Sequence, residues 1–164
     1  MIDVLTPEQR RFNMSRIGGR HTRPELLLRQ GLHARGLRFR LHGRDLPGCP
    51  DLVFPKYGVC LFVNGCFWHG HGCTLFKMPK TRAEFWENKI AGNRQRDARA
   101  TATLLDLGWR VLVVWECAIR GRYRIGIDEV LDICERFLVG DVKNPKANKL
   151  IEIKERVSGG VGVV

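Results

Sequence analysis

The sequence lacks a long hydrophobic run. No apolar stretch approaches the roughly 18 consecutive residues that a membrane-spanning helix requires. The opening residues, MIDVLTPEQRR, also lack the apolar core of a signal peptide. From these two absences we expect no membrane partner and a cytoplasmic location.

Acidic residues are scarce. The chain has 17 Asp and Glu residues against 28 Lys and Arg residues, which gives a formal net charge of +11. Such an excess on a small domain usually indicates a polyanionic partner. A basic surface that merely keeps the protein in solution is the alternative.

The sequence also has no internal repeat and no linker long enough to divide it. Its 164 residues fit one domain with a hydrophobic core. We therefore expect a single domain over residues 1–140, including an N-terminal helical arm at about residues 1–20. Beyond Gly140 the chain is charged and its apolar residues are scattered, so residues 141–164 are expected to form a partly disordered tail.

Helix and strand signals alternate along the chain. Thr6, Thr22 and Thr81 each stand where a capping residue begins a helix. The helices expected lie over residues 6–17, 22–35, 81–107 and 128–138. Strands are expected over residues 39–41, in a hairpin over 51–63, and in the apolar run 109–115. This order predicts an α/β fold with a central mixed β-sheet flanked by helices.

The hairpin is the strongest local signal. Asp51 begins a short apolar run, a four-residue turn follows, and a second apolar run over 59–63 leads away. Pairing of Phe54 with Val59 across the turn would place Asp51 beside the end of the second run. The chain reaches His69 shortly afterwards, so we expect a carboxylate and an imidazole to meet there.

Several of these side chains suit phosphodiester hydrolysis, which needs a divalent cation and a group that accepts a proton from water. Asp51 could hold Mg²⁺, which takes few protein ligands, or could be a plain turn residue. His69 could relay a proton, or could ligate a metal together with His71. Glu25 is either a helix-capping acid or a carboxylate presented to an active site.

A second cluster suits a softer metal. Cys66, His71 and Cys73 offer two thiolates and an imidazole within residues 66–73. Tetrahedral zinc takes four such ligands, and Cys117, just after the apolar run 109–115, is the candidate for the fourth. Six cysteines could instead form disulfides in a secreted protein, but without an export signal reduced thiols or metal ligands are expected. We predict a structural zinc site.

Large aromatic side chains stand close to both clusters. Phe67 and Trp68 lie in a polar loop, and Trp86 lies early in a basic helix. Such rings suit stacking on bases or wedging between them, although burial in the core is their usual role. Lys89 and Asn93 follow Trp86 on the same helix and would reach the same partner, unless they form a solvated face.

Four blocks of this sequence, PGCPDLVF, GCFWHGHGC, FWENKIAGNRQRD and LGWRVLVVWECAIRG, resemble the very-short-patch-repair (Vsr) mismatch endonucleases over residues 6–121. The resemblance implies a fold similar to type II restriction enzymes. It implies an enzyme that nicks double-stranded DNA on the 5′ side of the thymine in a T:G mismatch, which arises when 5-methylcytosine deaminates. It also implies association with the bacterial nucleoid and contacts with other mismatch-repair proteins. A single nick needs one active site, so we expect a monomer.

The resemblance implies the catalytic roles by position. Asp51 and the main-chain oxygen of Val63 would bind Mg²⁺, His69 would be the general base or proton relay, and Glu25 would support that histidine. The ligands implied for structural zinc are Cys66, His71, Cys73 and Cys117.

The resemblance also implies the DNA contacts. Phe67, Trp68 and Trp86 would form an intercalating wedge. Met14 and Ile17, on the DNA-clamping arm, would enter the DNA from the opposite side. Lys89 and Asn93 would read the mispair.

Positions 63 and 64 depart from the family pattern, because the best-known members carry Thr and His there. Val63 keeps a backbone ligand. Asn64 cannot exchange a proton near neutral pH, so it can only hydrogen-bond to phosphate or to metal-bound water. Two other hypotheses therefore stay open: a non-catalytic or disabled mismatch-binding protein, and a restriction-type nuclease that acts on paired sites.

Overall fold

The computed structural model describes residues 6–16, 18–140 and 149–156 of the chain. The helices are α1 (Pro7–Arg16), α2 (Arg23–Ala34), α3 (Ala83–Asp106), α4 (Glu116–Ile119) and α5 (Ile127–Gly140), with a 3₁₀ turn, η1 (Pro55–Tyr57). The strands are β1 (Arg40–Leu41), β2 (Leu52–Phe54), β3 (Val59–Asn64), β4 (Arg110–Trp115) and β5 (Leu150–Ile153). In these described ranges, no helix combines the length and the apolar character needed to cross a membrane.

The strands form one mixed sheet in the order β1-β2-β3-β4-β5. The pairs β1 with β2 and β2 with β3 are antiparallel, whereas β3 with β4 and β4 with β5 are parallel. Each parallel connection contains helices, which such crossovers require. The predicted mixed sheet flanked by helices is confirmed.

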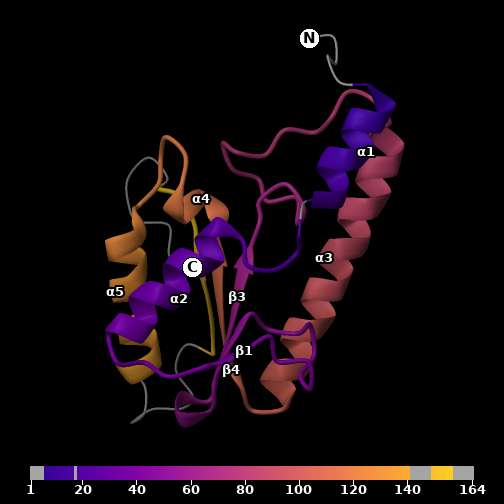
Figure 1. Ribbon diagram of the computed structural model, residues 1–164. Coiled ribbons are helices and arrows are strands. Elements are labelled where there is room, and N and C mark those ends of the chain that lie inside the picture. The colour runs from indigo at the N-terminus through magenta and orange to yellow at the C-terminus, as the bar shows by residue number, and fades with distance from the viewer. Residues whose placement is uncertain (1–5, 17, 141–148, 157–164) are drawn as a thin grey trace.

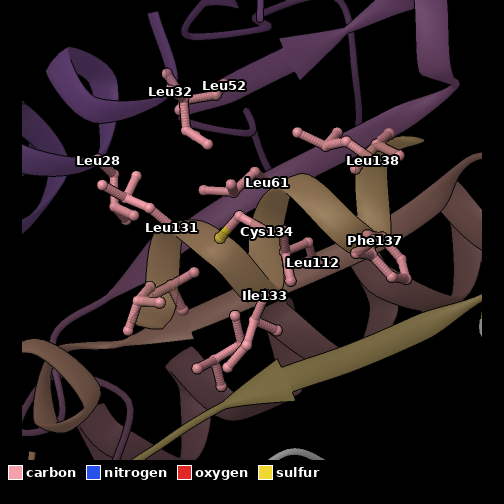
Figure 2. Packing of buried hydrophobic residues seen from close by; sticks show 14 of the residues in the cluster. Leu28, Leu32, Leu52, Leu61, Leu112, Leu131, Ile133, Cys134, Phe137 and Leu138 are labelled. Atoms are coloured by element: carbon pink, nitrogen blue, oxygen red, sulfur yellow. The ribbon is translucent and has the colours of Figure 1, made fainter. Parts of the chain in front are cut away.

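Helices cover both faces of the sheet (Figure 1). On one face, side chains of α2 and α5 pack with Leu61 of β3 and Leu112 of β4 into the larger core, which Figure 2 shows. On the other face, Leu104 of α3 packs with Cys60 of β3 and Val111 of β4. Because adjacent side chains on a strand point to opposite faces and both faces are covered, β3 and β4 carry apolar side chains on both faces over most of their length.

The hairpin has the predicted register. Phe54 pairs with Val59, and Gly58 has the positive φ of 62° that closes the turn with glycine at no steric cost. Leu52 pairs with Leu61, so the residue before Leu52 lies beside the end of β3. Asp51 is thereby held at the carboxyl end of that strand.

Two of the three expected helix caps are present. Gln9 N–H donates to Oγ1 of Thr6 at 3.2 Å, and Glu25 N–H donates to Oγ1 of Thr22 at 3.4 Å. The prediction of a helix cap at Thr81 was wrong. The chain enters α3 through Arg82, which has a φ of 55° and makes no side-chain cap bond, so the helix begins only at Ala83.

The sheet continues beyond the expected end of the domain at residue 140. β5 pairs with β4 in parallel, and its residues Ile151 and Ile153 are buried. Glu152, on the other face of the strand, accepts a hydrogen bond from Nε1 of Trp115 at 3.0 Å. A strand at the edge of a sheet needs apolar side chains only on its covered face, which made it resemble a polar tail in the sequence.

A charged residue, Arg110, begins the otherwise apolar strand β4. Arg110 is buried, and its Nη1 donates to the carbonyl of Phe137 at 2.7 Å. Its Nη2 donates to the carbonyls of Leu138 at 3.1 Å and Tyr57 at 3.2 Å. The guanidinium therefore joins the end of α5 to the turn of the hairpin.

Candidate active site and metal cluster

A cleft of about 280 Å³ opens at the carboxyl ends of β3 and β4. It is lined by Asp51, which precedes β2, by Asn64 at the end of β3, by His69 from the following loop, and by Asp97 of α3. His42, which follows β1, also lines it. The carboxylate and imidazole that the hairpin was expected to bring together thus share one cavity.

The carboxylate of Asp51 is fixed by the backbone of the neighbouring strand. Val63 N–H donates to its Oδ2 at 2.7 Å. Burial raises the pKa of Asp51 to about 6, and the hydrogen bond from Val63 opposes this shift. A carboxylate held in a partly buried site gains most from a bound cation, because the ion replaces the solvation that burial removed.

His69 pairs with a residue that the sequence analysis did not consider. Its Nδ1 lies 2.5 Å from Oδ2 of Asp97 on α3. A carboxylate only accepts hydrogen bonds, so this contact places the imidazole proton on Nδ1 and leaves Nε2 free to accept a proton. The sequence did contain a sign that Asp97 has a special role, because it is the one acidic residue between Glu87 and Asp106 in a strongly basic stretch.

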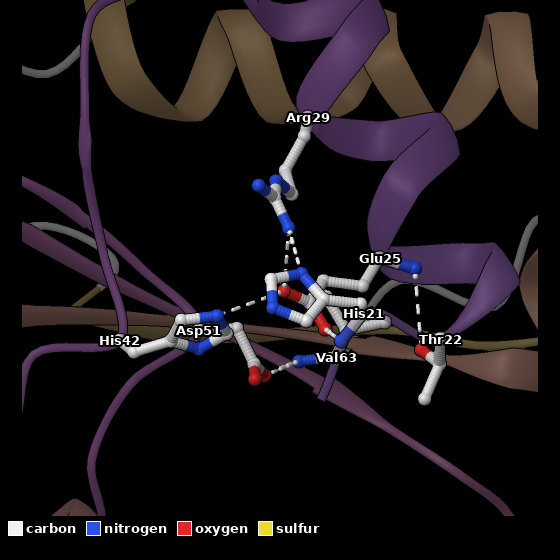
Figure 3. A network of polar contacts seen from close by, with 7 residues as sticks. All are labelled: His21, Thr22, Glu25, Arg29, His42, Asp51 and Val63. Carbon is white, nitrogen blue, oxygen red and sulfur yellow. Dashed lines mark hydrogen bonds and ion pairs between the residues drawn. The ribbon is translucent and has the colours of Figure 1, made fainter. Parts of the chain in front are cut away.

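In the structure His69 contacts Asp97, whereas Glu25 contacts other residues, so the expected support of His69 by Glu25 stays a prediction. Glu25 is 1% exposed and accepts a hydrogen bond from His21 N–H at 2.7 Å. Its Oε1 lies 3.3 Å from Nη1 of Arg29 and 3.7 Å from Nε2 of His42 (Figure 3). Glu25 lies in the first turn of α2, and its charge contributes to the raised pKa of Asp51.

The cysteine and histidine cluster forms as expected. Cys66, His71, Cys73 and Cys117 each offer one ligand atom, and these four atoms lie within 4.8 Å of one another. The ring of His71 stacks on Trp115 with 4.1 Å between centroids and an interplanar angle of 8°. Three thiols and one imidazole are a soft donor set, so this cluster could bind a metal ion.

The thiols of the cluster interact closely. A hydrogen bond with Cys66 lowers the pKa of Cys117 to about 5 and raises the pKa of Cys66. Glu155, just beyond β5, donates its backbone N–H to Sγ of Cys117 at 3.3 Å. Its carboxylate accepts a hydrogen bond from the Thr74 N–H at 2.9 Å, so residues 149–156 help to hold the metal loop, residues 66–74.

The three expected wedge residues lie together. The ring centroid of Phe67 lies 5.2 Å from that of Trp68 and 5.1 Å from that of Trp86. All three rings are partly exposed and belong to neither core cluster, and the adjacent Phe85 is 45% exposed. The structure therefore presents an aromatic group at the surface.

The aromatic group borders a second cleft next to the first. This cleft has a volume of about 460 Å³ and is lined by Trp68, Lys89 and Asn93, together with Asn64 and His69. Asn93 Nδ2 donates to the carbonyl of Trp68 at 2.6 Å. The expected mispair-reading residues thus share one cleft with Trp68 and with the candidate catalytic residues Asn64 and His69.

The two residues expected on the clamping arm cannot be placed. Ile17 and the side chain of Met14 lie outside the described residues. Val63 and Asn64, by contrast, both line the first cleft, as their expected roles require.

Comparison with known proteins supports the resemblance. A family model described as DNA mismatch endonuclease Vsr matches residues 2–75. The type II nicking enzyme V.XorIIP of Xanthomonas oryzae pv. oryzae is 53% identical over 119 residues, which cover 73% of this chain and 88% of that protein. The DNA mismatch endonuclease Vsr of Escherichia coli (strain K12) is 45% identical over 141 residues, or 86% of this chain and 90% of that protein. The chain belongs to the Vsr family of DNA mismatch endonucleases.

Proposed function

We propose that the protein nicks one strand of double-stranded DNA on the 5′ side of the thymine in a T:G mismatch, in a Mg²⁺-dependent hydrolysis. One observation carries the proposal: Asp51 and the paired His69 and Asp97 share a cleft that adjoins an exposed aromatic group. The names of the two relatives, a nicking enzyme and a mismatch endonuclease, support it.

The proposed cation site consists of the Asp51 carboxylate and the main-chain oxygen of Val63. A carboxylate and a carbonyl oxygen fit Mg²⁺, which takes oxygen ligands and keeps several waters. When bound, Mg²⁺ would polarise the scissile phosphate and stabilise the charge that develops on it. Asp51 remains in place for this role because Val63 N–H fixes one of its oxygens.

His69 is the proposed general base. Asp97 holds the proton on Nδ1, so Nε2 takes the proton from the attacking water. The same carboxylate stabilises the imidazolium that results. Asn64, at the rim of both clefts, has no proton to exchange near neutral pH and contributes hydrogen bonds to phosphate or water.

Recognition of the mismatch is assigned to the neighbouring surface. Phe67, Trp68 and Trp86 would enter the base stack, which a mispair has already weakened. Lys89 and Asn93 line the second cleft and would contact the mispaired bases there. Met14 and Ile17 on the N-terminal arm would approach the DNA from the opposite side.

We assign zinc to the second metal site. Three cysteine sulfurs and one histidine nitrogen form a closed set of four protein ligands, which is typical of structural zinc. The ion would fix the loop that carries Trp68 and His69, because Cys66, His71 and Cys73 flank both residues.

The test is strand-specific nicking of two end-labelled duplexes that differ only in T:G or T:A at one position, with and without Mg²⁺. A Mg²⁺-dependent cut beside the mismatched thymine alone would support the proposal. Tight mismatch binding without a cut would instead favour the disabled or non-catalytic binding protein that Asn64 suggests. Equal cutting of both duplexes would favour a restriction-type nuclease.

A further inference from the structure

We propose that His21, Glu25 and His42 form a binding site for a divalent transition-metal ion, separate from the cysteine cluster and from the Asp51 site. One ligand atom from each residue lies within 4.8 Å of the others. Figure 3 shows the three side chains converging beside Asp51. The site would bind its ion whether or not the protein nicks DNA.

The backbone brings the two histidines to the carboxylate. His42 N–H donates to the carbonyl of Asp51 at 2.9 Å, which extends the pairing of β1 with β2 by one residue. His42 leaves the strand with a φ of 49°, and its side chain lines the same cleft as Asp51. On the other side, the bond from His21 N–H to Glu25 holds the His21 ring over the first turn of α2.

The two imidazole rings are nearly perpendicular, and both lie close to the carboxylate of Glu25, as ligands of one ion would. The rings of His21 and His42 have centroids 5.1 Å apart and an interplanar angle of 87°. Nε2 of His42 lies 3.7 Å from Oε1 of Glu25, which is too long for a hydrogen bond. Two ligand atoms that each lie about 2.1 Å from an ion are separated by about 3.4 Å at a tetrahedral angle and about 4.2 Å across the ion. The observed separation falls within that range.

A buried polar atom also has no partner at this position. Nε2 of His42 is buried and makes no hydrogen bond, and it is the one buried side-chain nitrogen or oxygen without a partner in the part of the chain that the structure describes. Buried polar atoms without partners are rare and often indicate an absent water or ion. Here the atom faces the carboxylate of Glu25, so a cation between them would satisfy both groups.

The donor set defines the class of ion. Two imidazoles and one carboxylate suit zinc and first-row transition metals such as Co²⁺ and Ni²⁺. Mg²⁺ prefers oxygen ligands alone. The cysteine cluster, with three sulfurs, is softer. The chain would therefore present three cation sites of graded softness within one small domain.

Arg29 sets the affinity of the proposed site. Its Nη1 lies 2.8 Å from Nδ1 of His21 and 3.3 Å from Oε1 of Glu25, so the positive guanidinium contacts two of the atoms that would bind the ion. A metal ion and the guanidinium would compete for the same carboxylate oxygen and imidazole. Removing the Arg29 charge should therefore strengthen metal binding, which no purely structural role of this network would predict.

The experiment is a Co²⁺ titration of the full-length protein, with zinc in the cysteine cluster and excess Mg²⁺ present to saturate the Asp51 site. Calorimetry would count the ions, and the visible spectrum would identify the ligands. We expect one Co²⁺ per chain, with weak d–d bands and no thiolate charge-transfer band. His42→Gln should weaken binding by at least about tenfold, since even residues that only orient metal ligands have effects of that size. Arg29→Gln should tighten it.

Two further variants separate the alternatives. Asp51→Asn should leave Co²⁺ binding unchanged, and loss of binding in that variant would show that the ion occupies the Asp51 site instead. His21→Asn changes an exposed ligand, so it provides a second test if His42→Gln fails to fold. The proposal is overturned if no Co²⁺ binds in addition to the zinc, or if binding is indifferent to the changes at His21, Arg29 and His42. None of these readouts depends on nicking.

Discussion

Asp97, on α3, lies 2.5 Å from Nδ1 of His69, although 28 positions separate the two residues in the chain. His69 belongs to the irregular loop that follows β3, and its ring also lies edge-to-face with Trp115 of β4, with 6.1 Å between the centroids. The contact with Asp97 therefore makes the long basic helix part of the candidate active-site cleft. A helix that contacts DNA through Lys89 and Asn93 would at the same time position the proposed general base.

Replacing Asp97 should impair the reaction more than binding. Asp97→Asn keeps the size of the side chain but removes the charge and permits the wrong tautomer of His69. We expect the single-turnover nicking rate to fall by roughly 10²- to 10⁴-fold, with mismatch affinity almost unchanged. Asp106→Asn, at the exposed end of the same helix, is the matched control. Full activity in Asp97→Asn would remove the pair from the mechanism.

Replacing Asp51 should abolish nicking and yet stabilise the fold. Burial raises the pKa of Asp51 to about 6 from 3.8, so the folded protein disfavours the charged form. The resulting cost is complete above pH 6, decreases as the pH falls towards 4, and amounts to at most about 3 kcal/mol. Asp51→Asn should therefore raise the free energy of unfolding in Mg²⁺-free urea titrations, and the gain should be larger at pH 7.5 than at pH 5. An equal gain at both values would contradict this account.

The metal cluster should depend on Cys117. Cys117→Ser removes one of four ligands, so we expect loss of bound zinc and a decrease in unfolding free energy of about 3 kcal/mol or more. Atomic absorption measures the zinc content, and urea unfolding measures the stability. Cys49→Ser is the control, because Cys49 is exposed and outside the cluster. Unchanged zinc content in Cys117→Ser would exclude that residue from the ligand set.

Trp68 should determine discrimination, and the basic helix should determine general affinity. Trp68→Ala should weaken binding to a T:G duplex by about 1–3 kcal/mol while leaving matched DNA little affected. Arg99→Ala, at an exposed position of α3, should weaken binding to both duplexes alike, because phosphate contacts are independent of sequence. Competition binding with both duplexes measures the two effects. Equal losses on both duplexes in Trp68→Ala would contradict the wedge.

The buried arginine of β4 should be essential for stability. Arg110→Met retains an apolar stem but removes the donors to the carbonyls of Phe137, Leu138 and Tyr57. Buried carbonyls left without partners should cost roughly 2–4 kcal/mol in unfolding free energy. Urea unfolding of this variant, compared with Arg122→Met at an exposed position, provides the measurement. A change of the same small size in both variants would show that the buried contacts add nothing.

Local features of this protein were predictable because neighbouring residues in the chain constrain one another directly. The turn closed by Gly58 and the alternation of the two strands set the register that brings Asp51 to the end of β3. Cys66, His71 and Cys73 lie so close in sequence that a compact loop had to bring them together. The aromatic group formed as expected for a similar reason, although Trp86 reaches it from another element.

Features that depend on how distant elements pack were not predictable in the same way. The apolar pattern of β5 was too sparse to indicate a strand, and its place in the sheet follows only from its pairing with β4. The start of α3 depended on the backbone of Arg82 and not on the capping signal at Thr81.

The sequence by itself determined the layout of the hairpin, the short metal loop and the basic character of the long helix, because these follow from spacing and turn chemistry along a continuous chain. Only the tertiary structure decided which carboxylate lies beside which distant imidazole: Asp97 beside His69, and Glu25 beside His42. The physical reason is that packing across the whole core sets how each helix is oriented on the sheet. That orientation decides which of its side chains face the cleft and which distant residues they contact.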